Sequence, residues 1–208
     1  NGHYITPLDP PLERPFSLDI ALEMISIARQ LDRAGAWTLC QSTGQIRQVM
    51  ADGGFAAVLH MEGCEAIAAD LQALDVFYAA GLRSLGPVWS RNNIFGHGVP
   101  FNFPASPDIG AGLTPEGVAL VRACDDLGVL VDLSHLIEAG FWDVARQSSK
   151  PLVATQSGAV PPGAGRISTA SMARFISHAS IFLPRYSGVR PTISPARKTV
   201  STTNKSIP

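Results

Sequence analysis

Apolar residues recur at two spacings along the chain, one typical of helices and one of strands. Ser17 can cap a helix, and the segment LDIALEMISIARQLDRA that follows it has apolar residues at helical spacing until Gly35. The short apolar run FAAVLHM begins after Gly54 and is typical of a buried strand. The first third of the chain is therefore predicted to contain a helix followed by a strand.

The same alternation continues through the middle of the chain. It predicts further helices at 45–51, 69–80, 114–127 and 138–147, and further strands at 83–89, 129–133 and 151–154. Thr114 as N-cap, Pro115 at the first helical position and Gly128 at the exit define one helix closely. Strands separated by helices indicate an α/β fold with a parallel sheet.

Charge and composition divide the chain into two regions. Residues 1–159 hold nine basic and 17 acidic residues, whereas residues 160–208 hold seven basic residues and no acidic one. The second region also loses the alternation of helices and strands, and its composition is typical of disorder. We expect a domain at 1–159 and an irregular, disordered basic tail at 160–208. Our hypothesis for this abrupt change is a reading-frame change, which an intact frame on resequencing would contradict.

Composition and motifs exclude several classes of function. The basic residues of the tail are scattered without interleaved aromatic residues, so we expect no nucleic-acid partner. No apolar run reaches the ~20 residues needed to span a bilayer, and no export signal is recognised, so we expect a cytoplasmic protein without a membrane segment. The motifs of serine hydrolases, zincins and nucleotide-binding proteins are absent. The widely spaced cysteines are expected to be reduced core residues, namely Cys40, Cys64 and Cys124.

Candidate chemistry lies where the predicted strands end, because parallel βα folds gather their active sites at that edge. Glu62 and His135 end two different strands and would face a shared opening. A carboxylate oxygen and an imidazole nitrogen suit a divalent metal. Two other interpretations stay open, since Glu62 could cap the next helix and His135 could bond to a loop.

Three further polar residues have two interpretations each. Asp132 could orient a ligand imidazole, or could be a buried carboxylate bonded to backbone amides. His60 shares a strand face with Glu62 by the two-residue period of a strand, although such a histidine is more often structural. His97 lies in the loop FGHGVPF, where it could contact a substrate or remain solvated.

Four segments resemble the membrane dipeptidase (renal dipeptidase) family of zinc peptidases: AAVLHMEG, GLRSLGPVWSRNNIFGHGVPF, GLTPEGVALVRACDDLGVLVDLSH and EAGFWDVARQSSKPLVAT. The resemblance extends from Phe16 to Ala159. It implies a (β/α)8, TIM-barrel-like metallohydrolase in which two zinc ions share one glutamate and hydrolyse dipeptides through a metal-bound hydroxide. By this resemblance Glu62 is the bridging carboxylate and His135 is a ligand of the second zinc.

The chain departs from the family pattern in three places. The early His-x-Asp motif is echoed only by His3, with Ile5 in place of the aspartate. Gln156 stands where the family has a second histidine, and an amide oxygen is a poor zinc ligand beside imidazole. Arg166 lies near the place of the family's substrate-binding arginine, in a different context. We therefore expect an N-terminally truncated, incomplete barrel whose zinc site is weak and whose catalysis is crippled.

Two hypotheses without catalysis remain as alternatives to a dipeptidase. The incomplete barrel could serve as an interaction module that forms a homo-oligomer through open sheet edges. It could also be an unfolded remnant that exposes apolar surface and aggregates. Release of amino acids from a dipeptide in added zinc, sedimentation as a defined oligomer, or binding of hydrophobic dyes would distinguish the three.

Overall fold

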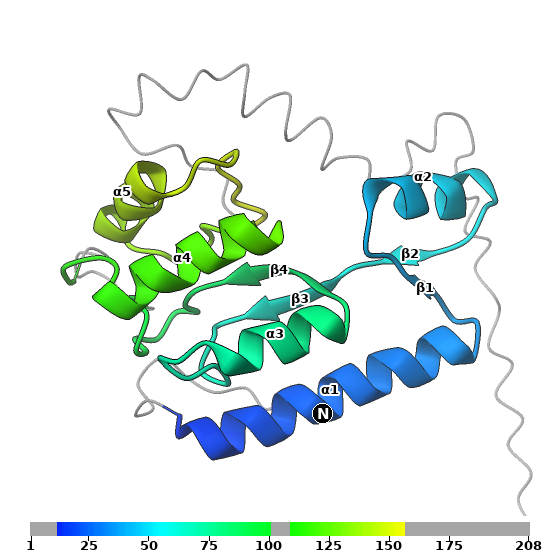
Figure 1. Cartoon of the computed structure of the whole chain (residues 1–208), viewed down its shortest axis with the longest axis horizontal. Helices are drawn as coiled ribbons and strands as arrows, with labels where there is room; N and C mark the ends of the chain where they lie inside the picture. The colour runs from blue at the N-terminus through cyan, green and yellow to red at the C-terminus, as the bar shows by residue number, and fades with distance from the viewer. Residues whose placement is uncertain (1–11, 101–108, 157–208) are drawn as a thin grey trace, which may run out of the picture.

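The computed structural model describes residues 12–100 and 109–156, and the predicted tail at 160–208 lies outside them (Figure 1). Helices and strands alternate within this part of the chain, and every strand pairing is parallel. The elements in order are α1 (Arg14–Arg33), β1 (Thr38–Leu39), α2 (Thr43–Ala51), β2 (Ala56–Ala57), β3 (Leu59–Glu62), α3 (Gln72–Ala79), β4 (Leu82–Gly86), α4 (Pro115–Leu127), β5 (Leu130–Val131) and α5 (Glu138–Gln147). The predicted α/β class is confirmed for these residues.

The strands form two small sheets that one extended segment joins. β1 pairs with β2, and β3, β4 and β5 pair in that order. β2 and β3 are separated only by Val58, so the same segment contributes to both sheets. A single parallel bridge from Asp132 to Val153 continues the order beyond β5. Neighbours in space are thus neighbours in sequence, with a helix between each pair, which is how consecutive βα units are arranged.

The helix predicted at 114–127 is confirmed, with the expected residues at both ends. The Thr114 hydroxyl accepts a hydrogen bond from the backbone N–H of Gly117 at 3.0 Å and donates one to the carbonyl of Ile94 at 2.5 Å. Gly128 ends α4 in the left-handed region, at φ 72°. The helix predicted at 138–147 is confirmed as α5.

Three predicted helix starts are wrong, and one strand was not predicted. The helix predicted at 45–51 begins at Thr43, after the N-cap Ser42. α1 begins at Arg14 and not after Ser17, because Pro15 fits the first helical turn; the Ser17 hydroxyl instead donates to the carbonyl of Glu13 at 3.2 Å. The predicted helix at 69–80 begins only at Gln72, whose N–H donates to a carboxylate oxygen of Asp70 at 3.1 Å. β1 at Thr38–Leu39 was not predicted, because its two residues are too few for a period.

The predicted strands are shorter in the structure. The run FAAVLHM is split between β2 and β3, and the strand predicted at 151–154 is reduced to the single bridge at Val153. Each of these segments makes few ladder bonds because its neighbours are short. The strand positions were therefore predicted better than the strand lengths.

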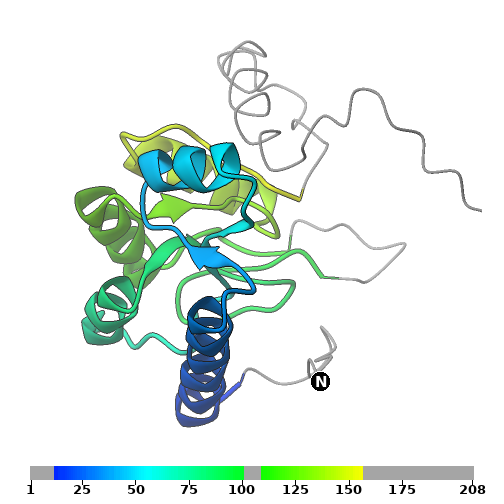
Figure 2. The same ribbon diagram turned by 90° about the vertical axis from the view of Figure 1, so that its right-hand side faces the viewer.

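The hydrophobic core lies between the β3–β4–β5 sheet and α3, α4 and α5. Figures 1 and 2 show α3 and α4 side by side on one face of this sheet. Fully buried core residues come from α3, β4, α4 and α5, among them Leu74, Phe77, Leu85, Leu120 and Val144. Cys40, Cys64 and Cys124 are buried and free, and burial raises the pKa of Cys124 to about 12. Among the described residues, none of the helices is both long enough and apolar enough to cross a membrane.

Candidate functional site

Glu62 is placed by the pleat of β3. Alternate residues of this strand are more exposed, which puts His60 and Glu62 on the same face, as the two-residue period predicted. The Glu62 side chain is 38% exposed, so it stands at an accessible edge of the sheet. The ring of His60 is turned to β4, where its Nδ1 lies 2.9 Å from the Ser84 hydroxyl.

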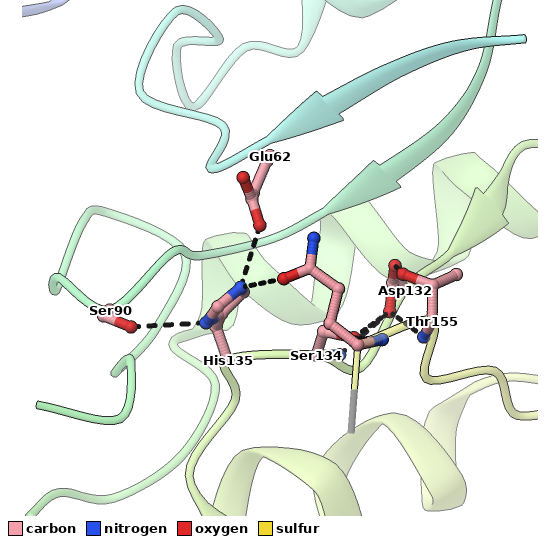
Figure 3. A network of polar contacts seen from close by, with 7 residues as sticks. Glu62, Ser90, Asp132, Ser134, His135 and Thr155 are labelled. Carbon is pink, nitrogen blue, oxygen red and sulfur yellow. Dashed lines mark hydrogen bonds and ion pairs between the residues drawn. The ribbon is translucent and has the colours of Figure 1, made fainter. Parts of the chain in front are cut away.

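His135 lies in the loop after β5, close to Glu62. Its Nε2 is 2.8 Å from Glu62 Oε1 and 2.9 Å from the side-chain oxygen of Gln156 (Figure 3). Its Nδ1 is 3.2 Å from the hydroxyl of Ser90. Three segments that each follow a strand therefore converge on one imidazole ring, as the positions at strand ends predicted for Glu62 and His135.

Asp132 holds the loops of His135 and Gln156 together. It is 1% exposed, and its Oδ1 accepts hydrogen bonds from Ser134 N at 2.9 Å, Ser134 Oγ at 2.7 Å and Thr155 N at 3.1 Å. Its Oδ2 accepts from the Thr155 hydroxyl, and the Ser134 hydroxyl in turn accepts from Gln156 N at 3.0 Å. Burial raises the pKa of Asp132, but the hydrogen bonds from Thr155 and Ser134 outweigh it and leave the pKa below its ordinary value. Its partners are backbone amides and hydroxyls, which matches the interpretation of Asp132 as a buried carboxylate bonded to backbone amides.

The loop after β4 contacts the backbone beside His135. Val99 N donates to His135 O at 2.8 Å, and Gly98 pairs with Leu136 in an antiparallel bridge. His135 has a φ of 68°, a left-handed conformation that is unfavourable for residues other than glycine. The bond from Val99 helps to hold this conformation.

His97 is part of the same loop and contacts its later part. Its Nδ1 donates to the carbonyl of Gly112 at 3.1 Å, and its ring is packed on Gly110, where an added Cβ would come within 2.3 Å of it. This arrangement connects the two ends of the loop. A role for His97 in substrate contact stays a prediction.

Two expected site residues are outside the described part of the chain. The roles expected for His3 and Arg166 therefore stay predictions. Within 12–100 and 109–156, no group of three His, Cys, Asp or Glu side chains could hold a metal ion. The donors that do converge are one carboxylate, one imidazole and one amide, which is a set for one divalent cation and not for two.

Sequence reasoning assigned no role to Ser90, Glu65 or Arg91. Ser90 is 2% exposed and is the described partner of His135 Nδ1. Burial raises the pKa of Glu65, although the charge of Arg91 and a hydrogen bond from Asn93 act against this rise. Arg91 is buried, and its Nε and Nη1 have no hydrogen-bond partner among the described residues. The position of Ser90 at a predicted strand end was the signal available for it.

Comparison with known proteins gives consistent matches. The sequence model of "Membrane dipeptidase (Peptidase family M19)" matches residues 8–161. A protein from the pqqA 5′ region of Klebsiella pneumoniae is 42% identical over 144 residues, which cover 68% of this chain and 53% of that protein.

Solved structures agree with the sequence match. A metallopeptidase from Rhodobacter sphaeroides, liganded with a phosphinate mimic of the dipeptide L-Ala-D-Ala, has a TM-score of 0.69 and 51% identity over 72% of this chain and 43% of that one. The structure described as dipeptidase AC, a metallopeptidase of family M19, gives the same TM-score and identity over 72% and 45%. This chain spans about half the length of these relatives.

Proposed function

The chain belongs to the membrane dipeptidase family, and we propose that Glu62, His135 and Gln156 form its part of a dipeptidase metal centre. One observation carries the proposal. The Oε1 atoms of Glu62 and Gln156 both lie within 2.9 Å of His135 Nε2, although the three residues come from separate strand ends. In a parallel βα fold this edge is where catalytic groups gather. We further propose that the described strands form one part of the wall of a (β/α)8 barrel.

The donor set suits a single zinc ion held weakly. A bound zinc ion would polarise a peptide carbonyl and lower the pKa of a water molecule. Glu62 would contribute the one negative charge, and neutral His135 would present the lone pair of Nε2. Gln156 would add a neutral amide oxygen in place of an imidazole. We propose that this exchange weakens metal binding and leaves little dipeptide hydrolysis in this chain.

Asp132 would support the site without touching the reacting groups. Its bonds to Ser134 and Thr155 fix the two loops that present His135 and Gln156. Mutation of a residue that hydrogen-bonds to a metal's ligands commonly lowers metal affinity by ~10 to 100-fold. The proposed substrate is a dipeptide, in keeping with the L-Ala-D-Ala mimic bound by the Rhodobacter sphaeroides metallopeptidase.

Calorimetric zinc titration of the full chain, with dipeptide hydrolysis measured in the same samples, tests the proposal. Glu62→Gln removes the only negative charge of the donor set and should weaken zinc binding by about tenfold or more. Glu23→Gln, on the exposed side of α1, is the matched control and should leave binding unchanged. Equal binding by the wild-type chain and Glu62→Gln would contradict the proposed centre.

Gln156→His tests the reason given for weak binding. An imidazole at this position would lie beside His135 and would be a better zinc ligand than the amide. Zinc affinity should rise by ~10 to 100-fold, with a gain in dipeptide hydrolysis. An unchanged affinity would mean that Gln156 is not what limits the site.

A non-catalytic role in self-association is favoured by a different observation. α1 leaves large apolar side chains exposed, namely Phe16 (50%), Leu22 (47%), Met24 (65%) and Ile27 (47%). Exposed apolar surface of this kind can mark an interface. Sedimentation of the wild-type chain and of Met24→Lys would test it, since an oligomer formed through α1 should dissociate in the variant.

A further inference from the structure

The imidazole of His135 has a polar partner on each side. Nε2 faces the oxygens of Glu62 and Gln156, whereas Nδ1 faces the hydroxyl of Ser90 at 3.2 Å. Figure 3 shows Ser90 and Glu62 at different nitrogen atoms of the ring. Ser90 is 2% exposed, so little water reaches its hydroxyl. The contact with Ser90 therefore holds the ring at Nδ1, while Nε2 faces the more exposed side chains of Glu62 and Gln156.

We propose that Ser90 is a positioning residue that keeps Nε2 of His135 directed at Glu62 and Gln156, ready to bind a divalent cation. The part of this inference that concerns the cation rests on the function proposed above. The part that concerns the ring does not, because the contact with Ser90 exists without a cation. Ser90 acts through His135 and does not touch the reacting groups.

A hydroxyl suits this role because it both donates and accepts hydrogen bonds. The two partners of Nε2 are oxygen atoms that accept, so a neutral, metal-free ring would be favoured with its proton on Nε2, and Ser90 would then donate to Nδ1. A cation at Nε2 needs the lone pair there, so the proton then lies on Nδ1 and is donated to Ser90. The hydroxyl rotates and the ring stays in place. A carboxylate at this position could only accept and would not serve the metal-free form.

The loop that carries Ser90 also holds the backbone of His135. Val99, nine residues after Ser90, donates to the carbonyl of His135 at 2.8 Å. Gly98 lies so close to the start of the loop that an added Cβ would meet the carbonyl oxygen of Trp89 at 1.8 Å. The two ends of the segment 89–99 therefore pack together, and the position of Ser90 is tied to the backbone position of His135.

The chain contains a second serine–histidine pair that provides a matched control. Ser84 Oγ and His60 Nδ1 are 2.9 Å apart on the neighbouring strands β4 and β3. Among the described residues His60 makes no bond to Glu62 or Gln156. Ser84→Ala thus removes the same kind of contact from a histidine that does not face the proposed cation.

The test uses the full chain labelled with ¹⁵N-histidine, with the ring signals of His135 assigned by comparison with His135→Asn. Ring nitrogen shifts report the tautomer, and zinc affinity is measured by calorimetry. Ser90→Ala should change the His135 ring shifts and weaken zinc binding by ~10 to 100-fold. Ser84→Ala should leave both unchanged. Ser90→Thr keeps the hydroxyl and should restore both, which separates the hydroxyl from a general loss of packing.

Two outcomes would overturn the inference. Ser90→Ala could have the same His135 ring shifts as the wild-type chain. Alternatively, Ser90→Thr could change the ring shifts and weaken zinc binding as much as Ser90→Ala does. If wild-type protein and Glu62→Gln do not differ in zinc binding, the proposed metal centre fails. In that event the ring shifts of the metal-free chain still decide the role of Ser90.

Discussion

The N-terminal region, residues 12–57, and the central region, residues 58–100 with 109–156, contain the same kinds of elements but differ in burial. Both regions alternate amphipathic helices with short parallel strands. In the N-terminal region only Ser17 and Cys40 are buried. In the central region α3, α4 and α5 bury whole side chains against the β3–β4–β5 sheet. An apolar period therefore predicts where a helix forms, but not whether another layer covers it.

The candidate site follows this difference, because its residues belong to the central region. Glu62, Ser90, His135 and Gln156 project from segments anchored by buried neighbours such as Phe95, Leu133 and Val153. A site that must hold its groups within a fraction of an ångström benefits from such support. The N-terminal region supplies β1 as a neighbour for β2, but none of the polar groups at His135.

The largest expected effect contrasts two phenylalanines, one from each region. Phe77 of α3 is 1% exposed in the core, whereas Phe55 before β2 is 66% exposed. Phe77→Ala should lower the free energy of unfolding by about 3–5 kcal/mol, because it removes buried apolar surface and leaves a cavity. Phe55→Ala should cost about 0.5 kcal/mol or less, since most of the Phe55 side chain is already exposed to solvent.

Urea denaturation of the two variants and the wild-type chain measures both values. Equal losses would mean that the N-terminal region is covered in solution by something that buries Phe55. A Phe77→Ala variant without any cooperative transition would agree with the prediction, since ~3–5 kcal/mol is a large part of a domain's stability.

The sequence predicted helices well where capping and periodicity agree, and strands less well. Thr114, Pro115 and Gly128 are local signals, so the helix between them could be placed to the residue. The length of β5 depends instead on how many residues of β4 and of the segment at Val153 lie beside it. Pairing of this kind is a property of several distant segments, which a single segment's pattern does not contain.

The second expected effect concerns the polar support of the central region. Asp132→Ala removes the acceptor of the bonds from Ser134 and Thr155 and should lower the free energy of unfolding at pH 7 by about 3 kcal/mol. The folded-state pKa of Asp132 is below its ordinary value, so its carboxylate stabilises the fold above the unfolded-state pKa of about 3.9. This stabilisation is lost as the pH falls through the folded-state pKa.

The difference between Asp132→Ala and the wild-type chain should therefore narrow in acid. Urea titrations at several pH values between roughly 7 and 3 would show it. A difference that stays constant over this range would mean that the carboxylate charge does not matter, and that Asp132 acts only by its size.

The closeness of Glu62 and His135 was predictable, because Glu62 ends β3 and His135 lies in the loop after β5, at the same edge of the sheet. The contact of Gln156 with His135 was expected only from the place of the family's second histidine. Ser90 was not predicted, because serine at a strand end is common and its partner lies 45 residues away. Long-range side-chain pairs of this kind follow from the fold and not from local sequence.

The smallest expected effects contrast two glycines, again one from each region. A Cβ at Gly98 would meet the backbone at Trp89 O (1.8 Å) and Arg91 N (2.7 Å), whereas one at Gly44 in α2 would meet only the Ser42 hydroxyl, at 3.8 Å. Gly98→Ala should force the segment 89–99 apart and cost about 2 kcal/mol. Gly44→Ala should stabilise the chain by about 0.5 kcal/mol, because alanine lowers the entropy of the unfolded chain and favours the helix. Urea denaturation would measure the change in the free energy of unfolding for each variant. The His135 ring nitrogen shifts should change in Gly98→Ala alone. Destabilisation by Gly44→Ala would show that the N-terminal region is packed more tightly than its exposed side chains indicate, and would remove the contrast between the two regions.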